Sequence, residues 1–383
     1  MQLPVTRAEI DLGAIAHNVA ALKGLLSEST RLMAVVKADA YGHGASQVAR
    51  TALAHGADHL AVARLNEALQ LRQDGLMAPI LLFGFAGADD VELLIENDIT
   101  ASLCSLAAAE VMDQAAGRLG KRLKVHVKVD TGMGRLGFQT RELGCDADAC
   151  GEILKLARLK NLELEGLYTH FACADSCDKT STLTQFARFE SLIAGLEARG
   201  LSIELKHAAN SAAVMELPQT HLDMVRPGIA IYGLYPSAEV DRSRLGLRPA
   251  MTLKSTVIQV KAVPAGFAIS SGSTYVTDRP AVIATVPVGY ADGYSRLLSS
   301  KGQMLVHGSR APIVGRVCMD LTMLDVSGIA DVRVGDEVVV FGRSGAAELS
   351  ADEVARLIGT INNEVKTAVN ARVPRIYRQR IWP

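Results

Sequence analysis

Short apolar segments of strand character alternate with amphipathic helical patterns through the first two-thirds of the sequence. Eight such segments occur, at residues 32–36, 60–63, 80–83, 100–103, 123–129, 164–169, 203–206 and 223–225. Helical patterns such as those at 45–54, 106–119 and 182–199 lie between them. Eight strands, each followed by a helix, over roughly 240 residues predict a (β/α)₈ barrel. A doubly wound open sheet has the same alternation and stays open as the alternative.

The pattern changes after Gly233. Strand-like alternation at residues 253–263, 282–288, 303–306 and 337–341 is separated by turns rich in Gly, Pro, Asp and Ser. One late helix is expected at 350–368, and the closing RVPRIYRQR is expected to be a packed edge strand. We therefore predict an α/β protein with an N-terminal (β/α)₈ TIM barrel, residues 1–240, and a C-terminal mostly β domain, residues 241–383.

Composition narrows the class of partner. The formal net charge of -1 argues against broad attraction to nucleic acid or to anionic membranes, so a small-molecule substrate is expected. No segment is apolar for long enough to span a membrane, and the N-terminus lacks an export signal, which predicts a cytoplasmic protein. The six cysteines show no zinc-binding spacing, so no metal and reduced thiols are expected.

A lysine stands at the end of the first predicted strand, in MAVVKADAYGHG. In a barrel, Lys37 would lie at the carboxyl end of the strands, where barrel enzymes build their active sites. A lysine desolvated there has its charged form disfavoured, so the amine becomes a nucleophile or base near neutral pH. A lysine that merely extends to solvent along the barrel rim is the alternative.

Polar clusters follow four later strands, and the barrel would gather them at the same rim. They are KVDTGMGR at 128–135, YTHFA at 168–172, HAANS at 207–211 and RPGI at 226–229. Hydroxyl groups and exposed backbone amides can surround a phosphate without fixed charge. A lysine able to form an imine beside such a phosphate site predicts pyridoxal 5'-phosphate as cofactor.

Specific motifs extend over nearly the whole chain. They are AEIDLGAIAHNV, VVKADAYGHG, KVDTGMGRLGF, THFA, HAANSAA, VRPGIAIYG, STY, VPVGYADGYSR, GRVCMD and RVPRIY. In this order the sequence resembles the alanine racemase family, the pyridoxal-phosphate barrel (fold-type III) racemases. The resemblance implies interconversion of L- and D-alanine, which supplies D-alanine for cell-wall peptidoglycan.

The resemblance assigns the two bases. Lys37 would bind the cofactor covalently and serve as the base on one face. Tyr275 would be the base on the other face, because a proton removed from one side of the α-carbon must be returned from the opposite side. In the family this tyrosine comes from the partner subunit, which implies a head-to-tail homodimer.

The resemblance also assigns the cofactor contacts. Arg226 would meet the pyridine nitrogen and, because arginine does not give up its proton, would leave that nitrogen unprotonated. His170 would orient Arg226. The phosphate would be held by Tyr41, Ser211, Gly228 and Ile229, with Asn210 nearby.

Substrate contacts are implied as well. Arg135 would steady the cofactor's phenolic oxygen and the substrate carboxylate, and Lys128 occupies the place where many relatives carry a carbamylated lysine. The Met319 amide would meet the substrate carboxylate, with Tyr290 near the inner entrance. The residues matching the substrate corridor are Asp175, Arg296 and Arg316.

Two positions depart from the family pattern. Ser271 and Asn363 stand where relatives carry tyrosines, so the way in is expected to be wider and larger amino acids such as serine or lysine are an alternative substrate range. A decarboxylase of the same architecture and a non-catalytic cofactor-binding protein rank lower, because Tyr275 and Arg226 match a racemase.

Overall fold

The protein is described here by a computed structural model, which covers residues 4–140 and 147–379. These residues form two compact units. The barrel unit contains the described residues of 14–40 and 45–248. The β unit contains the described residues before 14, residues 41–44 and the described residues from 249 onwards.

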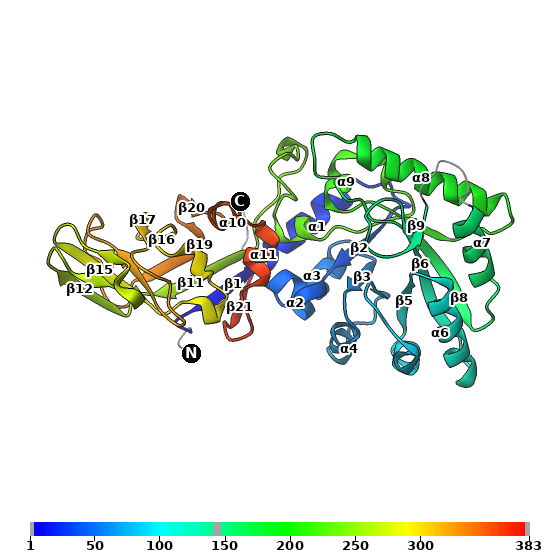
Figure 1. Ribbon diagram of the computed structural model, residues 1–383, viewed down its shortest axis with the longest axis horizontal. Coiled ribbons are helices and arrows are strands. Elements are labelled where there is room, and N and C mark those ends of the chain that lie inside the picture. The colour runs from blue at the N-terminus through cyan, green and yellow to red at the C-terminus, as the bar shows by residue number, and fades with distance from the viewer. Residues whose placement is uncertain (1–3, 141–146, 380–383) are drawn as a thin grey trace. The chain divides into compact units, whose positions relative to one another are not determined.

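Eight parallel strands form the centre of the barrel unit (Figure 1). They are β2 (Arg31–Val35), β3 (His59–Val62), β4 (Ile80–Leu82), β5 (Ile99–Leu103), β6 (Leu123–Asp130), β8 (Leu162–Tyr168), β9 (Leu205–His207) and β10 (Met224–Val225). Each pairs with the next in this order, and β10 pairs with β2. The ring is therefore closed, which confirms the predicted barrel over the open sheet.

Helices connect these strands and cover their outer side (Figure 1). They are α1 (Leu12–Lys23), α3 (Ala45–Ala54), α4 (Leu65–Gln73), α5 (Val91–Glu96), α6 (Leu106–Arg118), α7 (Ala147–Leu156), α8 (Thr180–Glu197) and α9 (Ser211–Glu216). In α3 the buried residues are Val48, Ala49 and Ala52, the spacing of one helix face. Because buried apolar faces of this kind recur with the helical period, the helices could be predicted from the sequence.

The β unit consists of mostly antiparallel sheets and two short helices. Its main sheet has the order β17 (Ser309–Pro312), β16 (Gln303–Val306), β19 (Glu337–Ser344), β11 (Met251–Thr256), β1 (Arg7–Asp11) and β21 (Arg375–Arg378), with β20 (Ala347–Leu349) on β19. A second sheet contains β12 (Gln259–Val263), β15 (Ala281–Val286) and β18 (Thr322–Asp325), and β13 (Ala268–Ile269) pairs with β14 (Tyr275–Val276). The mostly β second domain is thus confirmed.

Two expectations about this unit need correction. The single strand expected at 253–263 is two strands, β11 and β12, in different sheets. The single helix expected at 350–368 is two, α10 (Ala351–Ile358) and α11 (Asn362–Thr367). Gly359 ends α10 with a φ of 74°, in the left-handed region that glycine adopts without strain.

The N-terminal strand β1 lies between β11 and β21 and runs parallel to β21. The closing segment is therefore an edge strand, as predicted. The division of the chain into residues 1–240 and 241–383 stays a prediction, and it did not anticipate that the first strand would pair in the C-terminal sheet.

Cys150 takes part in a disulfide bond, so the expectation of reduced thiols is wrong for this residue. Cys104, Cys173, Cys177 and Cys318 are free, and Cys145 lies outside the described residues. No helix in the described ranges combines the length and apolar composition of a membrane span.

Candidate active site

Lys37 follows β2 directly and begins α2 (Lys37–Gly42), a turn with unusual handedness. Residues 38 to 42 have φ values of 53°, 51°, 52°, 52° and 79°, all in the left-handed region. For residues other than glycine this conformation costs roughly 1–2 kcal/mol each. Backbone strain of this kind persists only where the surroundings enforce it, and it is concentrated at functional sites.

Carboxylates hold the barrel-unit part of this turn. Glu67 Oε1 accepts a hydrogen bond from the Ala38 amide at 2.6 Å, and Asp39 Oδ1 accepts one from the Ala45 amide at 2.8 Å. Burial lowers the pKa of Lys37, the Arg135 cation lowers it further, and Glu67 opposes both. The net effect is a lowered pKa for Lys37, which is the direction that a nucleophilic or basic role requires, and that role stays a prediction.

Arg135 lies on the loop after β6, and one carboxylate shapes that loop. Asp130 accepts hydrogen bonds from the amides of Gly132, Gly134 and Arg135, each at 3.0 Å. The positive charge of Arg135 lowers the pKa of Lys37, of Lys128 and of His170, so these four side chains share one electrostatic environment.

Lys128 is 5% exposed on β6. Burial, followed by the nearby Arg135 cation, lowers its pKa to about 8. Its Nζ lies 5.7 Å from the centroid of the Tyr168 ring. Near pH 7 this amine is still mostly charged, but about a tenth of it is neutral, far more than for an exposed lysine.

Arg226 follows β10 and is 4% exposed. Its Nη2 donates to the carbonyls of Thr169 at 2.6 Å and Ala208 at 3.1 Å, and its Nη1 lies 2.9 Å from His207 Nδ1. His170 Nδ1 is more distant, at 3.5 Å. Among the described residues the hydrogen-bond acceptors of Arg226 are all neutral. Burial lowers its pKa to about 10, which still leaves it charged at neutral pH.

Ser211 begins α9 and connects it to the loop after β10. Its hydroxyl oxygen accepts hydrogen bonds from the amides of Gly228 at 2.9 Å and Ala230 at 3.3 Å. The neighbouring Asn210 caps α9 by accepting from the Ala213 amide at 3.2 Å. Ser211, Gly228 and Ile229, three of the predicted phosphate-binding residues, are therefore brought together.

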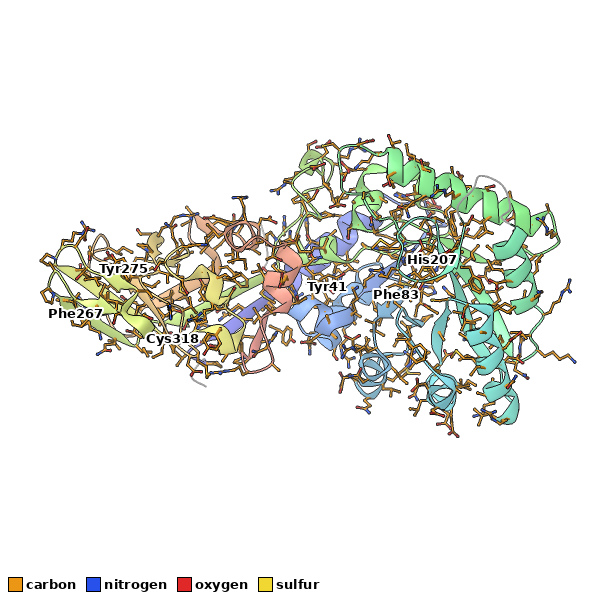
Figure 2. All side chains as sticks on the ribbon, viewed as in Figure 1. Tyr41, Phe83, His207, Phe267, Tyr275 and Cys318 are labelled. Carbon is orange, nitrogen blue, oxygen red and sulfur yellow. The ribbon has the colours of Figure 1, made fainter. Side chains whose placement is uncertain are left out.

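A second group of predicted residues lies in the β unit, where Figure 2 labels Tyr275 and Cys318. Tyr275 begins β14, opposite Ile269 of β13. Between them Ser270 Oγ donates to the Arg316 carbonyl at 2.6 Å, and Ser271 Oγ lies 3.4 Å from Cys318 Sγ. The turn that precedes Tyr275 is thus held by these contacts to the GRVCMD segment, residues 315–320.

Tyr290 and Met319 are neighbours in the same unit. The Tyr290 amide donates to the Cys318 carbonyl at 3.1 Å, and the Ala291 amide donates to the Met319 carbonyl at 3.0 Å. Gly289 has no room for a side chain, because a Cβ there would lie 2.3 Å from the Cys318 oxygen. Both Tyr290 and Met319 are exposed, by 42% and 54%.

Two family models match this chain. The alanine racemase N-terminal domain matches residues 10–236, and the alanine racemase C-terminal domain matches residues 250–377. The chain belongs to the alanine racemase family. The barrel and the β unit correspond to the two domains of that family.

Relatives and solved structures match nearly the full length of the chain. The alanine racemase of Desulfosudis oleivorans is 56% identical over 373 residues, which is 97% of this chain and 96% of that protein. The alanine racemase of Methanococcus maripaludis is 49% identical over 370 residues, 97% and 98% of the two chains. The structure of the Clostridium difficile 630 enzyme has a TM-score of 0.94 at 42% identity and covers 99% of this chain and 97% of its own. The Bacillus anthracis alanine racemase with bound L-Ala-P has a TM-score of 0.92 at 39% identity, covering 99% and 96%.

Two positions of this alanine racemase family member were predicted to depart from the family pattern, and that departure stays a prediction. Asn363, on α11, has a buried Oδ1 without a hydrogen-bond partner among the described residues. Ser271 is exposed and contacts the Cys318 thiol through its hydroxyl.

Tyr41, a predicted phosphate contact, has a buried phenol. Burial raises the pKa of this phenol to about 12, so the group stays protonated and able to donate a hydrogen bond.

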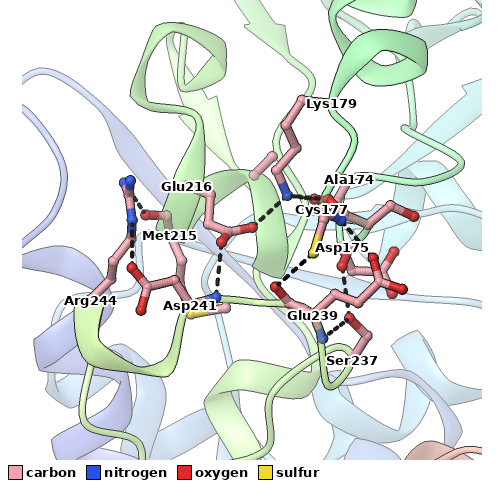
Figure 3. Close-up of polar contacts among 12 residues, drawn as sticks. Ala174, Asp175, Cys177, Lys179, Met215, Glu216, Ser237, Glu239, Asp241 and Arg244 are labelled. Carbon is pink, nitrogen blue, oxygen red and sulfur yellow. Dashed lines mark hydrogen bonds and ion pairs between the residues drawn. The ribbon is translucent and has the colours of Figure 1, made fainter.

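The predicted corridor residues lie in different units. Asp175 is in the barrel unit, in a polar cluster between residues 174–179 and 237–244 (Figure 3). Its carbonyl accepts from Ser237 Oγ at 2.7 Å, while nearby the Cys177 amide donates to Glu239 Oε2 at 2.6 Å. Arg296 and Arg316 belong to the β unit. Their joint role in a corridor stays a prediction.

Sequence reasoning assigned no role to two histidines of the barrel interior, although it had placed His207 in a polar cluster after the seventh predicted strand. His207 bonds Arg226 more closely than the predicted His170, and His126 Nδ1 lies 2.9 Å from His207 Nε2. His207 was visible in the HAANSAA motif, and His126 lies two residues before Lys128. Their contact, however, joins residues 81 positions apart in the chain.

Proposed function

We propose that the protein is an alanine racemase that interconverts L- and D-alanine with pyridoxal 5'-phosphate as cofactor. The observation that carries the proposal is the setting of Arg226, a buried cation with neutral acceptors, in a chain related to alanine racemases over its whole length.

The barrel residues fit this cofactor chemically. Lys37 supplies an amine whose pKa is lowered by burial and by Arg135, and an imine-forming lysine must be neutral. Ser211 and the backbone of 228–230 supply hydroxyl and amide groups suited to a phosphate. When bound, the cofactor would act as an electron sink that acidifies the α-hydrogen of the substrate.

Two bases on opposite sides would move the proton. Lys37 Nζ would take it from, or return it to, one face of the α-carbon, and the Tyr275 phenol oxygen would act on the other face. Because either base can remove the proton while the other returns one to the opposite face, the reaction would run in both directions.

Arg226 would limit how far the negative charge left by removal of the α-proton is drawn into the cofactor ring. A guanidinium donates but does not accept, so it leaves the pyridine nitrogen unprotonated and weakens the electron sink. Prompt return of the proton to the α-carbon would then outcompete side reactions. His170 and His207, both neutral because burial and the Arg226 charge lower their pKa, would help to hold the guanidinium.

Further contacts follow the same assignment. Tyr41, Ser211, Gly228 and Ile229 would bind the phosphate, with Asn210 fixing the start of α9. Arg135 and the Met319 amide would meet the substrate carboxylate, and Tyr290 would line the inner entrance. Asp175, Arg296 and Arg316 would form the outer corridor.

Lys128 would be carbamylated. Carbamylation requires a neutral amine, which attacks carbon dioxide and loses a proton, and the pKa lowered to about 8 provides that amine. The resulting negative charge would fix Arg135, whose field lowers the Lys128 pKa before modification.

We further propose a cytoplasmic head-to-tail homodimer in which Tyr275 serves the partner's Lys37 site and the product D-alanine enters peptidoglycan. The broader substrate range suggested by Ser271 and Asn363 is not favoured, because the curated relatives carry the name alanine racemase. A decarboxylase and a non-catalytic homologue have no support among them.

One experiment tests the activity and both bases. Purified protein is incubated with L-alanine in heavy water, and α-deuteration and D-alanine are followed together. Wild-type protein should yield deuterated D-alanine, and Lys37→Ala and Tyr275→Phe should each lose it by a factor of about 100 or more. Deuterium uptake that survives both substitutions would exclude the two-base assignment.

A further inference from the structure

Hydrogen bonds join Arg226 to two buried histidines in a row. Arg226 Nη1 lies 2.9 Å from His207 Nδ1, and His207 Nε2 lies 2.9 Å from His126 Nδ1. His126 is on β6, His207 ends β9 and Arg226 follows β10, so three different strands position the row. His126 and His207 are 2% and 0% exposed. Solvent therefore does not compete for these bonds.

The direction of every bond follows from the arginine. A guanidinium can only donate, so His207 Nδ1 must accept and therefore carries no proton. A neutral imidazole has one N–H, which places the proton of His207 on Nε2. That N–H donates to His126 Nδ1, so the proton of His126 lies on its own Nε2.

The row holds neutral histidines. Burial, then the neighbouring His59 and Arg226, lower the pKa of His126 to about 3. Burial, Arg226, His126 and His59 lower the pKa of His207 as well. A protonated His126 would point an N–H at His207 Nε2, and the His207 proton would then move to Nδ1, against the Arg226 donor.

The surrounding residues fix the rings in place. A Cβ on Gly166 of β8 would lie 2.5 Å from His126 Nδ1. The His126 ring therefore fits in its observed place only because residue 166 is a glycine. The Tyr168 ring stacks on His207 with the centroids 4.8 Å apart and the planes 1° from parallel. Figure 2 labels His207 inside the barrel.

We propose that His126 is a positioning residue that accepts the Nε2–H of His207 and thereby fixes the tautomer in which His207 Nδ1 receives Arg226. His126 thus acts on the site through two other side chains. The consequence at the cofactor rests on the proposed function: a correctly held Arg226 keeps the pyridine nitrogen unprotonated.

Nitrogen NMR of protein labelled with ¹⁵N-histidine tests the tautomer without reference to activity. In wild-type protein we expect His207 to show a protonated Nε2 and an unprotonated Nδ1. His126→Leu removes the acceptor, and a second His207 population with Nδ1 protonated should appear. His126→Asn places an amide oxygen near the former Nδ1 and should restore the wild-type signal.

His221→Asn is the matched control. His221 is also buried, at 6% exposed, and its Nε2 lies 3.0 Å from the Val214 carbonyl, outside the row. Its substitution should leave the His207 signals unchanged. A protonated Nδ1 on His207 in the wild-type spectrum would overturn the proposal by itself, even if His126→Leu did not fold. Unchanged His207 signals in folded His126→Leu would overturn it equally.

A second measurement tests the consequence at the cofactor. Holoenzyme containing ¹⁵N-labelled pyridoxal 5'-phosphate should show an unprotonated pyridine nitrogen in the wild type, in His126→Asn and in His221→Asn. In His126→Leu the nitrogen signal should move toward the protonated value, and pyruvate formed per racemisation should rise about tenfold, the effect of one pKa unit. A shifted tautomer with an unmoved pyridine signal would refute the link to Arg226. Failure of the proposed function would instead appear as protein without bound cofactor, while the histidine spectrum would still decide the tautomer.

Discussion

Lys366 on α11 is a buried lysine that the proposed reaction does not use. It is 1% exposed, and its Nζ has no hydrogen-bond partner among the described residues. Burial lowers its pKa from 10.5 to about 7, and the nearby Asp352 acts in the opposite direction. Near neutral pH the folded protein must therefore bury a charge or release a proton.

We predict that Lys366→Met stabilises the protein, and that the gain shrinks as pH rises. Because the folded pKa is the lower one, the unfolded chain binds more protons between pH 7 and 10.5, so wild-type stability increases with pH there by up to about 1.4 kcal/mol per unit. The variant lacks this slope. Its free energy of unfolding in urea should exceed that of the wild type by about 2–4 kcal/mol at pH 7 and by roughly 2 kcal/mol less at pH 9.

Lys121→Met is the control, because Lys121 is exposed. Its stability difference from the wild type should be small and should not change over the same pH range. If Lys366→Met keeps the wild-type pH dependence, Lys366 is not the source of that dependence.

At the residue scale, the sequence allowed us to predict polar residues whose position already suggests chemistry, but not the contacts among buried histidines. Lys37 and Arg226 were found because each is a polar residue at the end of an apolar strand. The His126–His207 contact was missed because it depends on β6 and β9 facing the same interior, with Gly166 of the intervening β8 leaving space. A single sequence does not contain that geometry.

At the element scale, α2 is the feature that most depends on its surroundings. Its left-handed turn ends at Gly42, which packs against α11 within the β unit. A Cβ on Gly42 would lie 2.5 Å from the Lys366 carbonyl oxygen. The Gly42 carbonyl also accepts from Arg375 Nε at 3.0 Å, so the turn has little freedom to move away.

We predict that Gly42→Ala destabilises the protein far more than Gly75→Ala. Both glycines have similar φ values, 79° and 81°, but nothing lies within 4 Å of a Cβ on Gly75. Gly75→Ala should cost the strain alone, roughly 1–2 kcal/mol. Gly42→Ala should cost about 1–3 kcal/mol more, because a backbone oxygen must move. Urea unfolding of the two variants measures the difference, and equal losses would show that the α11 contact is not limiting.

Element boundaries were predictable where hydrophobicity alone determines them. The barrel strands are buried apolar runs, and each was placed to within two residues. The breaks at Gly359 and between β11 and β12 were missed because apolar periodicity continues across both. The handedness of α2 was also missed, since ADAY carries no local preference for positive φ.

At the scale of the whole molecule, the first and last strands of the described residues, β1 and β21, pair in one sheet. Glu9 of β1 accepts from Arg7 at 3.0 Å and from Arg378 of β21 at 3.1 Å, and its carboxylate lies 3.3 Å from Lys254 Nζ. Burial alone would raise the pKa of Glu9, but these three cations hold it below its ordinary value. Such non-local pairing has no signature in a single sequence, which is why the predicted division at residue 240 assigned β1 to the barrel.

The proposed head-to-tail dimer leads to a prediction about how two different inactive chains complement one another. If Lys37 of one subunit works with Tyr275 of the partner, a mixed dimer of Lys37→Ala and Tyr275→Phe chains contains one site with both wild-type bases and one with neither. Random exchange of equal amounts of the two inactive variants should therefore restore activity to about a quarter of the wild-type sites. The measurement is racemisation of alanine after the variants are unfolded together and refolded with cofactor. Each variant refolded alone is the control and should stay inactive. Were Lys37 and Tyr275 of the same chain to share a site, every site in the mixture would lack one base, and no activity would return.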